Sequence, residues 1–131
     1  FFKQKTAYEM TSSLVGSVDT SDVVSQGYSL NLPLYCVSGK AAHSSYSLVS
    51  TDKDNIIIET VKKAEDSSDT VIRAYETWNK TTDCVYTFDR VPKSVYVCNL
   101  LEENEEQLEV NGNTVALRFK PFEIKTVKVT F

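Results

Sequence analysis

The sequence predicts an all-β protein, an antiparallel sandwich of about eight to ten short strands with at most one short helix. Alternating apolar and polar residues, as in residues 115–119, recur at short intervals with turn-forming residues between them. No strand–helix–strand rhythm and no repeat of fixed period interrupts that pattern. The chain has only four glycines and three prolines. A barrel needs many bends, so this composition favours the sandwich.

Size and charge predict one globular domain over residues 1–131. Of the 131 residues, 41% are hydrophobic and 24% charged, which is ordinary for a folded domain with its own core. The net charge of −4, with no run of more than two Lys or Arg, lacks the basic footprint of nucleic-acid binding. No apolar run is long enough for a membrane helix. We therefore expect neither nucleic acid nor membrane as a partner.

The first residues indicate a lead-in segment, residues 1–26, to the main fold. The chain opens with Phe1-Phe2 rather than with Met, and its first residues do not form a signal peptide, so we expect a C-terminal fragment of a longer protein. A strand within residues 1–10 and a turn over 11–16 are expected. Capping side chains at 19–22 then favour a helix that Gly27 ends after two turns at most. Short strands are expected over residues 34–37 and 45–49.

Residues 55–79 predict a β-hairpin, the most distinctive stretch of the chain. A β-branched run opens it at residues 56–61, and a second run follows at 70–78. The polar residues 64–69 between the runs favour a turn. A helix over residues 59–65 is the alternative, which the β-branched lead-in and the immediate second strand disfavour.

The remaining strands follow from alternation and turn signals. Residues 84–89 and 94–100 predict two strands, separated by Pro92. The acidic residues 101–106 predict a bend. Asn111-Gly112 predicts a hairpin with a type I′ turn, which needs positive φ at both residues. The last two strands are expected over residues 114–119 and 126–131.

Few residues support catalytic or metal chemistry. His43 is the one histidine, and its loop lacks the context of a nucleophile elbow, so we interpret it as a surface residue. Acidic clusters at 65–69 and 102–106 are interpreted as solvated turns, because neither has the spacing of a calcium loop. The three cysteines lack zinc-ligand spacing. We expect them buried and reduced, with a Cys84–Cys98 bridge as the alternative for an exported protein.

Aromatic residues offer a weak sugar-binding signal. Tyr75 and Trp78 point to opposite faces of the predicted strand. Tyr75 is expected in the core or on the surface of the sheet, and packing in the core is the favoured interpretation for these aromatic residues. Trp78 lies near the strand end and is kept as a possible sugar contact. The sequon that begins at Asn79 has meaning only in a secretory protein.

Four motifs in order resemble one family. Residues 60–66 (TVKKAED) and 72–76 (IRAYE) resemble paired strands in the C-terminal β-sandwich region of glycoside hydrolase family 38, the α-mannosidases. Residues 121–127 (PFEIKTV) are similar to the closing strand, and 27–34 (GYSLNLPL) to the lead-in. Residues 11–25 depart from the family pattern. The resemblance covers about residues 27–131.

The resemblance implies a part of a larger enzyme. Family members are retaining exo-acting α-mannosidases with a catalytic Asp and a zinc ion in an N-terminal domain, so we carry over no catalytic or metal residue. It implies an accessory domain that packs on the parent's own catalytic domain, with mannose-containing glycans as partners of the parent. The signature resembles the cytosolic and vacuolar type, which implies a cytoplasmic location.

Charged residues of the hairpin form a candidate interaction cluster: Lys62, Lys63, Glu65, Arg73 and Glu76. They are expected to form a cross-strand charge ladder or to face the catalytic domain. Exposed ion pairs contribute only about 0–1 kcal/mol each, so stability alone explains such a cluster poorly. An independent carbohydrate-binding or adhesion module is the alternative function, because β-sandwiches serve many functions.

Overall fold

The computed structural model describes residues 23–32 and 34–131. The chain divides into two compact units, Phe1–Tyr35 and Cys36–Phe131, each described here by itself. The strand expected within 1–10, the turn at 11–16 and the capping run at 19–22 lie outside the described residues. Whether residues 1–26 form a lead-in to one domain stays a prediction.

The first unit contains the helix α2 (Val23–Asn31). The prediction that Gly27 ends this helix is wrong, since the helix continues for four residues beyond it. A glycine inside a helix costs only about 1 kcal/mol, which does not force termination. The Asn31 side-chain amide donates to the Gly27 carbonyl at 2.7 Å, so the helix's own end supplies the cap.

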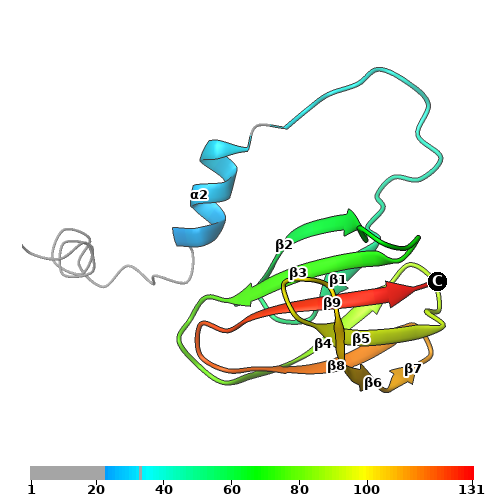
Figure 1. The fold of residues 1–131 in the computed structure, drawn as a ribbon. Helices are drawn as coiled ribbons and strands as arrows, with labels where there is room; N and C mark the ends of the chain where they lie inside the picture. The colour runs from blue at the N-terminus through cyan, green and yellow to red at the C-terminus, as the bar shows by residue number, and fades with distance from the viewer. Residues whose placement is uncertain (1–22, 33) are drawn as a thin grey trace, which may run out of the picture. The chain divides into compact units, whose positions relative to one another are not determined.

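The second unit is a two-layer antiparallel sandwich, as predicted (Figure 1). The described part of the chain has nine strands: β1 (Val49–Thr51), β2 (Ile56–Lys63), β3 (Thr70–Glu76), β4 (Thr82–Phe88), β5 (Ser94–Cys98), β6 (Asn104–Leu108), β7 (Val110–Asn111), β8 (Thr114–Phe119) and β9 (Ile124–Thr130). Sheet A has the order β1-β4-β8-β7, and sheet B has the order β2-β3-β9-β5-β6.

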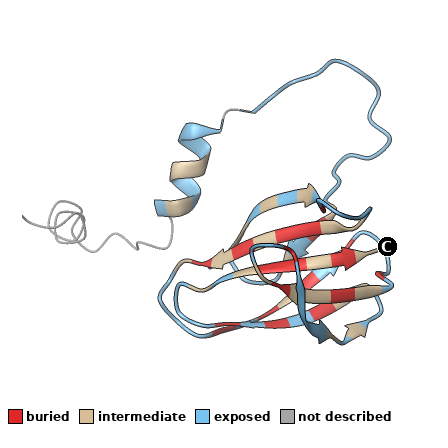
Figure 2. Ribbon diagram, in the orientation of Figure 1, coloured by how far each residue is buried: buried red, intermediate tan, exposed pale blue. Residues whose placement is uncertain are grey.

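The core lies between the two sheets, and in strands such as β4 and β8 alternate residues are buried in it (Figure 2). In β8, Val115, Leu117 and Phe119 face inward, while the residues between them are exposed. In sheet B, Ile72 and Ala74 of β3 pack with Val127 and Val129 of β9. This strict period of two explains why sequence alternation found these strands.

Three sequence predictions about elements are corrected, and one alternative is excluded. Residues 34–37 form no strand, and the strand expected over 45–49 is β1, which begins only at Val49. The acidic residues expected in a bend instead contribute Glu105 and Glu106 to β6, which pairs with β5. The alternative helix over 59–65 is wrong, because those residues belong mainly to β2.

The β7–β8 hairpin is present but its turn lies one residue later than predicted. Asn111 pairs with Thr114, so Gly112 and Asn113 form the loop, and only Gly112 has positive φ, at 59°. Glycine at the first loop position is the pattern of a type II′ turn rather than type I′. Asn113 fixes this register, because its side-chain amide donates to the Phe88 carbonyl at 2.8 Å and its carbonyl accepts from Phe88 N at 2.9 Å.

Candidate functional site

The candidate site lies on the outer face of sheet B, the face turned away from sheet A. Lys62 of β2, Val71 of β3 and Lys128 of β9 are successive partners in the strand register. The next residues along, Ile72 and Val127, belong to the core. Because side chains alternate along a strand, the row of Lys62, Val71 and Lys128 projects from the outer face.

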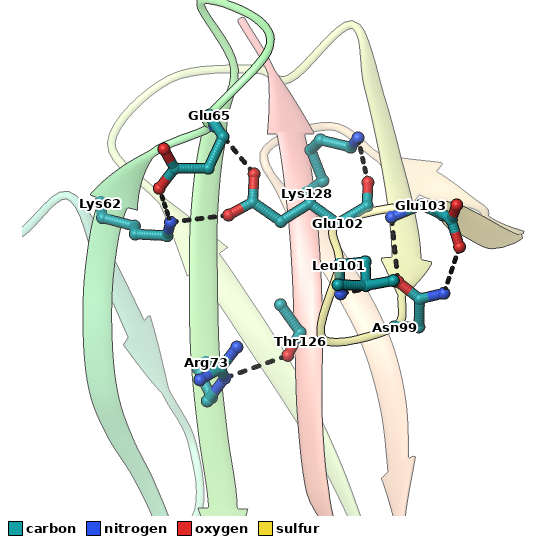
Figure 3. A network of polar contacts seen from close by, with 9 residues as sticks. All are labelled: Lys62, Glu65, Arg73, Asn99, Leu101, Glu102, Glu103, Thr126 and Lys128. Atoms are coloured by element: carbon teal, nitrogen blue, oxygen red, sulfur yellow. Dashed lines mark hydrogen bonds and ion pairs between the residues drawn. The ribbon is translucent and has the colours of Figure 1, made fainter.

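Glu102 bridges this row from the β5–β6 loop (Figure 3). One carboxylate oxygen lies 2.7 Å from Lys62 Nζ, and the other accepts a hydrogen bond of 2.9 Å from the backbone N–H of Glu65. The Lys128 ammonium donates to the Glu102 carbonyl. We call these contacts of Glu102 with Lys62, Glu65 and Lys128 the Glu102 clamp.

The Glu102 clamp covers the apolar side chain of Val71 and stabilises the ionised carboxylate of Glu102. Val71 has an exposed fraction of only 1%, although it lies on the outer face. The pKa of Glu102 is lowered, chiefly by the hydrogen bond from Lys62 and then by that from the Glu65 amide. The pKa of Lys62 is raised, first by Glu102 and then by Glu65. The interpretation of Glu102 as a solvated turn residue is therefore wrong, because its loop folds back over the sheet.

Asn99 gives the β5–β6 loop its shape. Its side-chain oxygen accepts from Leu101 N at 2.9 Å and from Glu103 N at 3.1 Å, and its amide donates to the Glu103 carboxylate at 2.7 Å (Figure 3). Asn side chains commonly hold turns by bonding to the following backbone. The loop can thus hold Glu102 at φ 65°, a conformation that costs most residues free energy.

The predicted charge cluster is only partly brought together. Lys62 and Glu65 form an ion pair at 2.6 Å, and Lys63 ends β2 in an exposed position. Arg73 donates to the Thr126 hydroxyl at 3.2 Å, in the next outward row. In the register, Lys62 lies opposite Val71, and Arg73 opposite Thr60, so unlike charges do not face each other across β2 and β3.

Glu76 lies at the other end of β3 and is buried, with an exposed fraction of 1%. Its carboxylate accepts hydrogen bonds from the Asn55 amide at 2.8 Å, Trp78 N at 2.7 Å, Phe122 N at 2.9 Å and Lys80 N at 3.3 Å. We call this arrangement the Glu76 cage. Burial alone raises the pKa of Glu76, but the hydrogen bonds from Phe122, Asn55, Trp78 and Lys80 outweigh it, and the net shift is downward.

Trp78 lies at the surface rather than in the core, which corrects the favoured interpretation. Strand β3 ends at Glu76, so Trp78 falls in the following loop, with an exposed fraction of 38%. Its ring borders a shallow polar groove of 470 Å³ that Asp52, Asp54 and Asp83 also line. The Lys80 ammonium lies 4.6 Å from the ring centroid. A sugar contact at Trp78 stays a prediction.

The other candidate residues are placed as follows. His43 is exposed, as predicted. Cys84 and Cys98 are buried, as predicted, and both are free, and their strands β4 and β5 belong to different sheets. Cys36 is exposed, contrary to the prediction that all three cysteines are buried. Within residues 23–32 and 34–131, no three His, Cys, Asp or Glu side chains come together as metal ligands would. In the same ranges we find no helix with the length and hydropathy that a membrane crossing requires.

Comparison with known families decides what kind of domain this is. The sequence model for the glycosyl hydrolases family 38 C-terminal beta sandwich domain matches residues 55–127, more than half of the chain. The chain belongs to this family. The match to the family 38 sandwich domain includes Glu76, with the side chain and backbone groups that surround it, and Glu102 with Lys62 and Glu65. It ends one residue before Lys128.

Curated relatives of this family 38 domain are much longer proteins. Alpha-mannosidase G of Dictyostelium discoideum is 34% identical over 121 residues, covering 86% of this chain and 11% of that protein. Alpha-mannosidase 2C1 of Homo sapiens is 31% identical over 127 residues, covering 89% of this chain and 12% of the relative. The chain therefore spans roughly a tenth of the length of these relatives.

Proposed function

We propose that this chain is the non-catalytic C-terminal accessory domain of a retaining α-mannosidase, and that it packs on and buttresses the catalytic domain. The parent enzyme hydrolyses terminal α-linked mannose of glycans. The observation that carries this proposal is the family 38 match over residues 55–127, with relatives named as alpha-mannosidases that extend far beyond the matched part. The candidate contacts to the rest of the parent include Lys62, Lys63, Glu65 and Arg73.

The chemistry of the parent is assigned to residues outside this chain. Zinc is implied for the catalytic domain by the family resemblance. The described residues do not fit a zinc site, since they bring no three possible ligands together. We therefore assign no catalytic step to them. A cytoplasmic location, with the vacuole as alternative, is proposed from the resemblance and agrees with the free cysteines.

Two measurements test the accessory role. The full-length parent should hydrolyse 4-nitrophenyl α-mannoside, and the 131-residue chain alone should not. Titration calorimetry of the chain with mannose and an α-mannobioside should give no binding heat. Hydrolysis by the isolated chain, or a parent without α-mannosidase activity, would contradict the proposal.

The second candidate function, an independent carbohydrate-binding module, is favoured by one observation. The partly exposed ring of Trp78 borders a groove with three carboxylates, and sugar sites combine aromatic rings with polar groups. This candidate predicts binding heat with mannosides that Trp78→Ala abolishes. The matched control is Tyr46→Ala, which removes another exposed aromatic side chain.

A further inference from the structure

An apolar row crosses the outer face of sheet B at the end opposite the Glu102 clamp. Ile57 of β2 pairs with Tyr75 of β3, and Tyr75 pairs with Ile124 of β9. Their neighbours Ile58 and Ala74 pack in the core, so this row projects outward. Ile124 has an exposed fraction of 62%. Ile57 and Tyr75 are half-buried, so three neighbouring strands present partly or fully exposed apolar side chains at one place.

A groove continues the row onto β5. It has a volume of 390 Å³ and lies between Ile124 and Leu100, whose exposed fraction is 73%. Charged residues that also line it are Glu105, Glu123 and Lys125. Apolar side chains combined with polar and charged ones are the usual composition of a protein–protein interface.

The outer face of sheet A differs in kind. Its outward positions include Asp83 and Arg118, an exposed pair with atoms 3.7 Å apart, and the register partners Thr87 and Thr114. The pair between them, Val85 and Ala116, is apolar but has small side chains. Charged and hydroxyl side chains of this kind are readily hydrated. Of the two outer faces, that of sheet B therefore carries the larger apolar side chains at its surface, and exposed apolar patches of this kind mark interaction sites.

We propose that the apolar row of Ile57, Tyr75 and Ile124, together with Leu100, is the surface by which this domain docks on the remainder of its parent polypeptide. The inference rests on the proposed function. The partner of this surface is inferred from chain length. The chain covers only 11–12% of each relative that it matches, so most of such a polypeptide lies outside the chain and is available to cover the row. The Glu102 clamp covers Val71 at one end of the face and leaves the other end for this contact.

Hydroxyl-radical footprinting tests the docking surface directly. Oxidation rates of Leu100, Tyr75 and Ile124 are compared between the 131-residue chain and the full-length parent. We expect severalfold slower oxidation of these side chains in the parent. The control side chain is Val91, with an exposed fraction of 64%, which should be oxidised equally in both.

A pair of matched variants tests the energetic role of the row. Ile124→Asp in the parent should give a separate, earlier unfolding transition for the domain, because a charge at the centre of the contact opposes docking. Val91→Asp, with nearly the same exposure, should leave a single transition. The isolated chain carrying Ile124→Asp should melt at the wild-type Tm, which shows that the variant folds.

The outcomes separate this inference from the proposed function. A parent that hydrolyses α-mannosides while the row is oxidised at the same rate as in the isolated chain would overturn the docking surface alone. A parent without that activity would remove the proposed function as well. A wild-type chain that sediments as a dimer and becomes monomeric with Ile124→Asp would assign the row to a second copy. Slower oxidation of the row in the isolated chain on addition of mannose would assign the row to sugar binding. Either this result or the dimer result would overturn the inference.

Discussion

Glu76 shows how one buried carboxylate organises several segments of chain. Its carboxylate oxygens accept hydrogen bonds from Asn55 before β2, from Trp78 and Lys80 after β3, and from Phe122 before β9. Two residues with positive φ, Asn79 at 56° and Phe122 at 54°, lie within or beside these segments. Strained backbone persists where surrounding contacts hold it, and the Glu76 cage supplies those contacts.

Removing this carboxylate should destabilise the domain strongly. Glu76→Ala leaves the buried Asn55 amide and the partly buried backbone N–H groups of Trp78 and Phe122 without this acceptor, and each unsatisfied buried group costs about 1–3 kcal/mol. We expect the free energy of unfolding to fall by about 3 kcal/mol in urea denaturation. Glu109→Ala, at an exposed position, is the control and should change it little. Equal midpoints for the two variants would show that the cage contributes no stability.

The stability contributed by Glu76 should depend on pH. Its folded-state pKa lies below the ordinary value of 4.5, so the contribution is complete above that value and is lost as the pH falls through the folded pKa. The glutamine side chain in the Glu76→Gln variant cannot ionise. The difference in free energy of unfolding between wild type and Glu76→Gln should thus be constant from pH 7 to about 5 and shrink below pH 4.5. A difference that grew on acidification would contradict the sign of this pKa shift.

At the scale of elements, the Glu102 clamp joins a hairpin turn to a loop 37 residues away in sequence. Glu102→Ala removes the acceptor of the Glu65 amide. We expect that amide to exchange with solvent severalfold faster, measured by NMR, because its hydrogen bond is lost. The Ala64 amide, bonded to the Asp69 carbonyl at 2.8 Å within the turn, should change less.

The matched control for the clamp is Glu105→Ala. Glu105 is an exposed acidic residue of β6, and its loss removes the same charge from the same region. Exchange at Glu65 should stay at the wild-type rate in this variant. If both variants accelerated exchange equally, the effect would come from net charge rather than from the hydrogen bond.

The elements that sequence predicted are those in which burial alternates locally. Strands β3, β4, β8 and β9 show this period in their own residues. Strand β6 does not, because four of its five residues are exposed and its existence depends on pairing with β5. The shift of the β7–β8 turn likewise depends on Asn113 bonding to Phe88, a contact 25 residues away in sequence.

The candidate site was predictable to the same limited extent. Lys62 and Glu65 lie three residues apart, so their pairing could be read from the sequence. Glu102 and Lys128 come from distant segments, and only the order β2-β3-β9-β5-β6 brings them over Val71. Glu76 was expected in the charged cluster of the hairpin, and its burial could not be predicted because its acceptor role depends on backbone amides of two separate loops.

At the scale of the whole molecule, thiol reactivity reports the fold. Cys36 is exposed, whereas Cys84 and Cys98 are buried. Burial raises the pKa of Cys84 to about 11, and burial likewise raises that of Cys98, so both stay protonated and unreactive near neutral pH. Titration with a thiol reagent should modify Cys36 at once and the other two only in denaturant. Rapid reaction of all three in the native protein would contradict the burial of Cys84 and Cys98.

The acidic strand β6 has a consequence for how copies of the protein meet. It forms one edge of sheet B, with Glu105 and Glu106 exposed, and β2 at the other edge carries an irregularity between Ile58 and Thr60. The edges of sheet A, β1 and β7, are only three and two residues long. Charge, bulges and short length each discourage intermolecular strand pairing and aggregation. Association is thereby directed away from the strand edges and toward the faces of the sheets.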